Sequence, residues 1–157
     1  MDLTKLGIGL VEEYGYYALF LIGFFEPIFQ PVPNEIFMIA GITLGMDWKL
    51  VLISATIGIT LGSSVTYYLS SKYGEKLVLK LFGREKYLKS QEFLKKWGFF
   101  GIIIASFAPV PFELICWTSG IFKMPFKVYI FAVFFSRIIK YTLIVLPFAA
   151  IAKFWQF

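Results

Sequence analysis

One proline–glutamate motif occurs twice in this chain, each time inside a strongly apolar run. It reads Pro31-Val32-Pro33-Asn34-Glu35 in the first half and Pro109-Val110-Pro111-Phe112-Glu113 in the second. Proline breaks a helix, and in hydrocarbon an unmatched backbone group costs several kcal/mol. An ionisable side chain at mid-depth costs roughly 3 kcal/mol or more. Because both features are costly in a membrane, a helix break that is repeated and carries an acidic residue predicts a functional site.

The composition places this site in a membrane protein. Hydrophobic residues make up 59% of the 157 residues and the mean hydropathy is +0.76, whereas soluble domains contain roughly 45–50% apolar residues. We expect one membrane domain, 1–157. The chain has no histidine and a single cysteine, Cys116, which excludes an intrachain disulfide and removes the commonest metal ligand. We therefore expect neither a metal nor another cofactor.

Two apolar segments are long enough to cross a bilayer. Residues 50–71 contain no charge, and residues 128–152 form a still longer apolar run. At 1.5 Å per residue each exceeds a hydrocarbon core of about 30 Å. The proline-broken segments, 16–45 and 99–122, instead consist of pieces of about 10–14 residues, which are too short to cross alone.

Each proline-broken segment has the pattern of a re-entrant hairpin, which enters the bilayer, turns near its middle and leaves by the same face. The turns would lie at Pro31 and Pro33 in the first hairpin and at Pro109 and Pro111 in the second. One proline-kinked span per segment is the alternative, because the joined pieces are long enough to cross.

The first predicted span also carries a helix-packing motif. Gly58 and Gly62 form a GxxxG pattern, and such small residues let the backbone of another helix approach closely. Taken alone, this motif is ordinary for membrane helices.

The charges orient the chain. Residues 72–97 hold eight basic residues against three acidic ones, so the positive-inside rule makes this segment cytoplasmic. We expect the membrane to be the plasma (inner) membrane. With hairpins, the two halves then have opposite orientations. The expected fold is an all-α integral membrane protein with an inverted repeat of re-entrant helical hairpin plus transmembrane helix.

An interfacial amphipathic helix is expected between the halves. Tyr87, Phe93, Leu94 and Trp97 share one side of a helical wheel that is otherwise rich in lysine. Attraction to anionic headgroups and a solvated loop that only sets the orientation both explain this pattern. The basic excess does not indicate nucleic acid, because the positive-inside rule accounts for it. Residues 1–14 are expected to form an N-terminal interfacial segment.

The apolar segments contain three acidic residues, which are Glu26, Glu35 and Glu113. Glu35 and Glu113 would lie in the first turn of the helix after each proline pair, where free N–H groups and the helix dipole stabilise a carboxylate. A capping role, with Asn34 as the cap of the first helix, is an equally good explanation. Glu26 immediately precedes Pro27, late in its helix, and is harder to explain as a cap.

Two cations lie deep in the last span. Arg137 is roughly 15 Å into the hydrocarbon core, and Lys140 follows three residues later, so that both share one face of the helix. Cations at that depth need acidic partners. We infer a midplane cluster of these two cations with the three carboxylates, and we expect Tyr141 to add a hydroxyl to it.

Taken in order, these motifs resemble the DedA family, also called the SNARE-associated or VTT-domain family. The first signature runs from Glu26 to Glu35 and is followed by Gly41. The second half is similar to the short YqaA-like members, through residues 106–116, Gly120, Met124 and 137–141. Most of the family has arginines at two positions where this chain has Ser106 and Phe112, so the chain departs from that pattern.

The resemblance implies lipid handling. The family is associated with two opposed re-entrant hairpins, with moving polyprenyl phosphate or phospholipid headgroups across bilayers, and with proton-dependent envelope homeostasis. We therefore expect a lipid flippase or scramblase whose partners are membrane lipids with anionic headgroups. In this hypothesis Arg137, Lys140 and Tyr141 bind the headgroup, and the residues for proton coupling or gating are Glu26, Glu35 and Glu113.

Two hypotheses from other classes stay open. A proton-coupled transporter of small ions or cationic compounds could use the same acids, and a non-transporting membrane scaffold would need the charges only for packing. An enzyme is not expected, since the sequence contains no recognisable nucleophile with a base, metal set or cofactor cradle. The short chain is also compatible with a homodimer.

Overall fold

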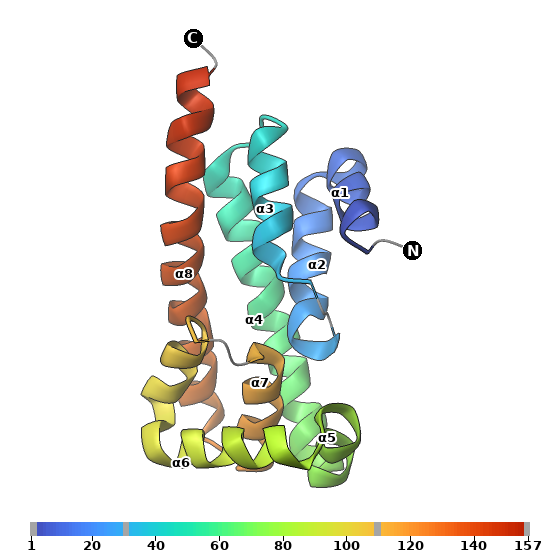
Figure 1. Cartoon of the computed structure of the whole chain (residues 1–157), viewed down its shortest axis with the longest axis vertical. Helices are drawn as coiled ribbons and strands as arrows, with labels where there is room; N and C mark the ends of the chain where they lie inside the picture. The colour runs from blue at the N-terminus through green and yellow to red at the C-terminus, as the bar shows by residue number, and fades with distance from the viewer. Residues whose placement is uncertain (1–2, 30–31, 109–110, 156–157) are drawn as a thin grey trace.

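The computed structural model describes residues 3–29, 32–108 and 111–155, and the regular secondary structure there is helical (Figure 1). No strand occurs in these ranges, so the predicted all-α class is confirmed. The helices there are α1 Leu3–Tyr14, α2 Tyr16–Phe29, α3 Asn34–Thr43, α4 Trp48–Tyr73, α5 Glu75–Phe82, α6 Arg84–Ala105, α7 Phe112–Ile121 and α8 Phe126–Trp155.

Helices α4 and α8 are long and apolar enough to cross a membrane. Each contains a suitable stretch of 26 residues, Trp48–Tyr73 and Phe126–Ile151, which corresponds to about 39 Å of helix against a hydrocarbon core of about 30 Å. The two segments that the sequence predicts as spans, 50–71 and 128–152, lie within these two helices.

The chain turns back between α2 and α3. The backbone N–H of Asp47, just beyond α3, donates to the hydroxyl of Tyr16, the first residue of α2, at 3.0 Å. The far ends of the two helices therefore lie together, and Figure 1 shows α3 returning beside α2. Pro33 is the N-cap residue of α3, whereas the predicted turn residue Pro31 lies outside the described residues.

A second pair of short helical segments comes from α6 and α7. Gly98 has φ 51° and ψ −125°, a left-handed conformation that favours glycine, and it kinks α6 between its basic and its apolar part. Helix α7 begins after its N-cap residue Pro111; Pro109 lies outside the described residues. In Figure 1, α3 lies beside the upper part of α8 and α7 lies in the lower half of the molecule.

Glycines let the short helices pack tightly on α4. A Cβ on Gly58 or Gly62 would overlap the carbonyl oxygen of Phe20 or Phe24, respectively, so the backbones of α2 and α4 are in direct contact. Gly120 of α7 approaches the other half of α4 in the same way. Helix α3 packs on α8, whereas α7 packs mainly on α4. One short helix of each half, α3 or α7, therefore contacts the long helix of the other half.

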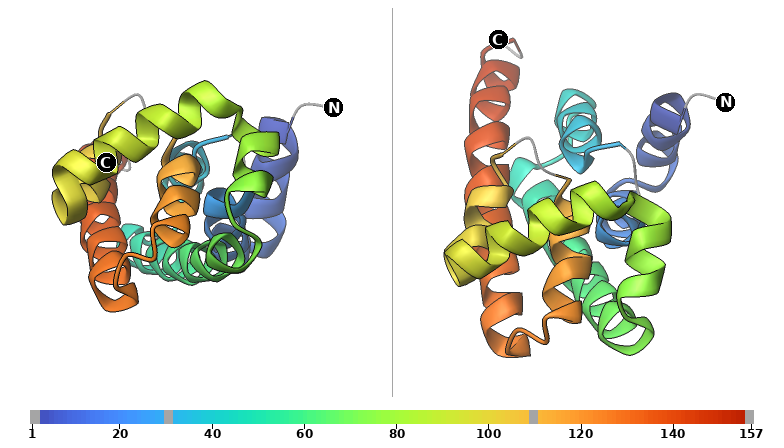
Figure 2. Two further views of the ribbon diagram at one scale, coloured as in Figure 1. Left: turned by 90° about the horizontal axis from the view of Figure 1, so that it is seen from below. Right: turned by 60° about the horizontal axis from the view of Figure 1, so that its bottom comes forward.

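The basic stretch forms two helices that cross one end of the bundle (Figure 2). Helix α5 and the first part of α6 replace the single loop or helix expected over 72–97. Tyr87 and Leu94, which the sequence places on the apolar side of an interfacial helix, are buried, and the hydroxyls of Ser90 and Thr118 lie 2.8 Å apart. The apolar side of this helix thus covers α7, while Trp97 remains 44% exposed.

Replacing Gly62 by alanine tests the close contact of α2 with α4. Gly62→Ala should lower the free energy of unfolding by about 1–3 kcal/mol, because its Cβ would push against backbone. Gly9→Ala is the matched control, since a Cβ there meets nothing within 4 Å, and it should raise stability by about 0.5–1 kcal/mol. Thermal unfolding in detergent measures both, and equal effects of the two substitutions would contradict the packing described.

Candidate functional site

Charged side chains gather inside the bundle where α2, α3 and α8 meet. Glu26 comes from α2, Glu35 from α3, and Arg137 and Lys140 from α8. Arg137 is 1% exposed, both glutamates are buried, and the side chain of Lys140 is 24% exposed. The cluster is therefore buried on the Arg137 side and reaches the surface at Lys140.

Ion pairs connect these four side chains. Arg137 Nη2 lies 3.3 Å from Glu26 Oε1, and Arg137 Nη1 lies 3.6 Å from Glu35 Oε1. Lys140 Nζ lies 2.6 Å from the same Glu35 oxygen. Two carboxylates thus face two cations, which is the compensation that buried charges require.

Aromatic side chains complete the surroundings of Arg137. Its Cζ lies 3.7 Å from the centre of the Phe112 ring and 5.7 Å from that of Tyr141, so one face of the guanidinium is covered by a favourable cation–π contact. The Tyr141 hydroxyl donates to Glu26 Oε2 at 3.2 Å. Phe112 begins α7, so the second half of the chain contributes directly to the cluster.

The nitrogens of Arg137 are charge-compensated but not hydrogen-bonded. Among the described residues, none supplies Nε, Nη1 or Nη2 with an acceptor in hydrogen-bond geometry. A guanidinium carries five N–H donors, and buried donors are normally satisfied by protein or water. The site therefore offers spare donors to a further acceptor.

Glu113 stands at the edge of the cluster. It is half-buried in the first turn of α7, and within the described ranges it forms no salt bridge. Arg137 and Lys140 are nonetheless close enough to interact with it electrostatically. The structure thus brings Glu26, Glu35, both cations and Tyr141 into contact but leaves this third carboxylate without a direct cationic partner there.

Asn34 does not cap α3, so that expectation is wrong. The N-cap residue is Pro33, which makes no side-chain cap hydrogen bond, and Asn34 is already inside the helix. Its side chain is fully buried. The fixed φ of proline allows the helix to start one residue earlier than a capping asparagine would require.

Two side chains from other helices, neither of which the sequence analysis assigned to the site, donate hydrogen bonds to the end of α2. Thr66 Oγ1 donates to the carbonyl oxygen of Pro27 at 3.1 Å, and Trp117 Nε1 donates to that of Ile28 at 3.4 Å. These carbonyls directly follow Glu26, in the last turn of α2. No spacing rule links residues so distant in sequence, and tryptophan in an aromatic-rich chain carries no signal by itself.

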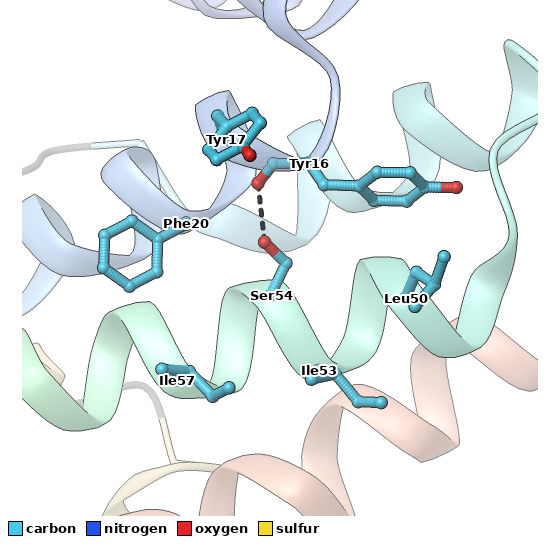
Figure 3. Close-up of a pocket in the computed structure, with 7 residues that line it drawn as sticks. All are labelled: Tyr16, Tyr17, Phe20, Leu50, Ile53, Ser54 and Ile57. Atoms are coloured by element: carbon cyan, nitrogen blue, oxygen red, sulfur yellow. Dashed lines mark hydrogen bonds between the residues drawn. The ribbon is translucent and has the colours of Figure 1, made fainter.

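A separate groove of about 440 Å³ lies between α2 and α4 (Figure 3). The side chains that line it are mostly apolar, and its one serine, Ser54, donates its hydroxyl to the carbonyl oxygen of Tyr16. None of the described lining residues is charged. This groove suits hydrocarbon and offers no partner to a charged headgroup, so the buried cluster is the candidate site.

Comparison with known families and proteins finds one family model and several relatives. Residues 32–150 match the VTT domain. A Methanocaldococcus jannaschii protein of uncharacterised function is 59% identical over 90% of this chain and 88% of its own length. An "alkaline phosphatase-like protein" of Lactococcus lactis is 28% identical over 98% of this chain and 78% of its own.

A more distant relative carries the name of a transporter. The Staphylococcus aureus "undecaprenyl phosphate transporter A" is 24% identical over 73% of this chain and 63% of its own length. No solved structure matches the chain.

Removing Arg137 should destabilise the protein strongly. Arg137→Met leaves Glu26 and Glu35 with too little positive charge, so the free energy of unfolding should fall by about 3–5 kcal/mol. The control is Lys89→Met, because Lys89 forms a 2.7 Å pair with Glu85 in which both side chains are exposed, and such pairs contribute little. Unfolding in detergent should show no measurable change for the control; similar losses in both variants would refute a special role of burial.

Proposed function

This chain belongs to the VTT-domain (DedA) family of membrane proteins, and from that premise we propose that it moves the anionic headgroup of a polyprenyl phosphate or phospholipid across the bilayer. The observation that carries the proposal is the buried guanidinium of Arg137, whose N–H groups lack acceptors among the described residues. Phosphate oxygens are acceptors that match the planar fork of arginine. The name of the transporter-like relative from Staphylococcus aureus points to the same class of substrate.

The proposed topology is an inverted repeat of two re-entrant hairpins and two spans. It is supported by the return of α3 to the start of α2 and by the packing of α3 on α8 and of α7 on α4, each on the long helix of the other half. Helices α2 and α3 would enter from outside, while α7 and the apolar part of α6 would enter from the cytoplasm. Residues 72–97 would lie on the cytoplasmic face of the plasma membrane.

Proton coupling follows from the charge balance of the cluster. Arg137 and Lys140 are already paired with Glu26 and Glu35, so a phosphate must compete with a carboxylate for them. Protonation of a carboxylate in this cluster would remove negative charge from beside the cations and free them for the headgroup. Glu26 and Glu113 are further groups that could carry or gate the proton, in support of envelope homeostasis.

Single substitutions in reconstituted liposomes test this function. Arg137→Lys, which keeps the charge, and Lys140→Gln should each lower the rate of translocation about 10- to 100-fold, the effect of losing a charge-assisted hydrogen bond of about 1.5–3 kcal/mol. Glu35→Gln and Glu113→Gln should remove the pH dependence of the rate. The rate is measured as polyprenyl phosphate that becomes accessible to added, impermeant phosphatase.

Lys89→Gln serves as the control, since Lys89 is exposed and far along the chain from the cluster. It should translocate at the rate of the wild type. Unchanged translocation in all four cluster variants would sink the proposal and leave a scaffold. A flux of ions without lipid movement would favour a proton-coupled ion transporter. The observation that supports this second candidate is the third carboxylate, Glu113, which forms no salt bridge within the described ranges.

The hairpin topology is tested by accessibility of single cysteines in a Cys116→Ala background. Glu13→Cys and Thr43→Cys flank the first helix pair, and both positions are exposed. An impermeant maleimide should label both from the same side of the membrane, and Lys76→Cys from the opposite side. Labelling of positions 13 and 43 from opposite sides would instead establish a kinked span.

A further inference from the structure

Asn34 is a buried polar side chain whose hydrogen bonding is incomplete. It is fully buried, it does not cap α3, and neither amide atom makes a hydrogen bond of good geometry among the described residues. The Tyr141 hydroxyl, which donates to Glu26, is close enough to interact with the amide of Asn34, but this contact does not satisfy both amide groups. Leaving a buried polar group unsatisfied normally costs about 1–3 kcal/mol, so the position needs another explanation.

Thr56 on α4 is a second such side chain. It is 2% exposed, and its hydroxyl likewise has no partner in the described ranges. Hydroxyls further along the same helix behave differently, since Thr60 and Ser64 each donate to the carbonyl oxygen four residues earlier. A threonine within a helix commonly donates its hydroxyl to the carbonyl oxygen four residues earlier, and Thr56 does not make this hydrogen bond.

Asn34 and the turn of α4 that contains Thr56 both lie close to Gly23 of α2. A Cβ on Gly23 would stand 3.0 Å from Asn34 Nδ2 and 2.8 Å from the carbonyl oxygen of Ala55. The amide of Asn34 and the α4 turn that follows Ala55 therefore face the same glycine. The next residue of α3 after Asn34 is Glu35, which pairs with both cations. Asn34 therefore stands directly beside the charged cluster in the chain.

From this juxtaposition we infer that Asn34 and Thr56 form an uncharged hydrogen-bonding subsite for the phosphate of the translocated headgroup. The inference rests on the proposed function and adds to it. Arg137 and Lys140 supply charge, whereas the amide N–H and the threonine O–H donate neutral hydrogen bonds to phosphate oxygens. The amide oxygen of Asn34 can accept a hydrogen bond from a protonated oxygen of the same phosphate.

A binding role and a structural role predict opposite effects on stability. Removing a polar group that is satisfied in the folded protein destabilises it, whereas replacing an unsatisfied one by an apolar group of similar shape is neutral or stabilising. Residues kept for function at the expense of stability show the second behaviour. Stability and substrate affinity therefore have to be measured on the same variants.

The test uses Thr56→Val and Asn34→Leu, which keep the size of each side chain. Both should unfold at the temperature of the wild type or above it. In proteoliposomes with increasing amounts of polyprenyl phosphate, both should raise the apparent KM about three- to tenfold, the effect of losing a neutral hydrogen bond, and leave the maximal rate within about twofold.

Thr118→Val is the matched control. Thr118 is as buried as Thr56, but its hydroxyl donates to the carbonyl oxygen of Leu114 at 2.6 Å and contacts Ser90. This variant should unfold at a lower temperature and keep the KM of the wild type.

The outcomes separate this inference from the proposed function. An unchanged KM in Thr56→Val and Asn34→Leu, with translocation lost in Arg137→Lys, would overturn the subsite alone. A loss of stability in Thr56→Val as large as that in Thr118→Val would also overturn it, because the hydroxyl would then be structural. Wild-type protein that translocates no phosphate lipid would overturn both.

Discussion

The burial of one guanidinium organises the centre of this molecule. Arg137 lies midway along α8, is almost completely buried, and could not be stable there without opposite charge. Glu26 at the end of α2 and Glu35 at the start of α3 supply that charge. The break between α2 and α3 must therefore fall beside Arg137, so the position of the helix ends and the position of the cation depend on each other.

Close packing of backbones brings these groups within reach. Between apolar helices in lipid there is little hydrophobic driving force, and contact depends on small residues and polar bonds. Gly58 and Gly62 bring α2 against α4, and Thr66 and Trp117 hold the last carbonyl groups of α2. The carboxylate of Glu26 is thus placed by contacts from two other helices.

The cluster combines complete charge compensation with incomplete hydrogen bonding. Arg137 has two carboxylates nearby, yet its nitrogens have no acceptor of good geometry among the described residues. The side chains of Asn34 and Thr56 likewise make no hydrogen bond of good geometry there. A site evolved only for stability would satisfy these groups or replace them by apolar side chains. The unsatisfied donors therefore favour a ligand over a purely structural role, and the charge balance favours a ligand whose binding is linked to a proton.

The all-helical class and the two span candidates were predictable from the sequence, because bilayer thickness and the cost of buried charge act on local runs of residues. The family was recognised by the resemblance of its ordered motifs. Only the tertiary structure decided the partners. Glu35 pairs with both cations while Glu113 pairs with neither among the described residues, Asn34 is not a cap, and Tyr87 and Leu94 face the protein. These outcomes depend on how helices distant in sequence are rotated against each other, which no local pattern specifies.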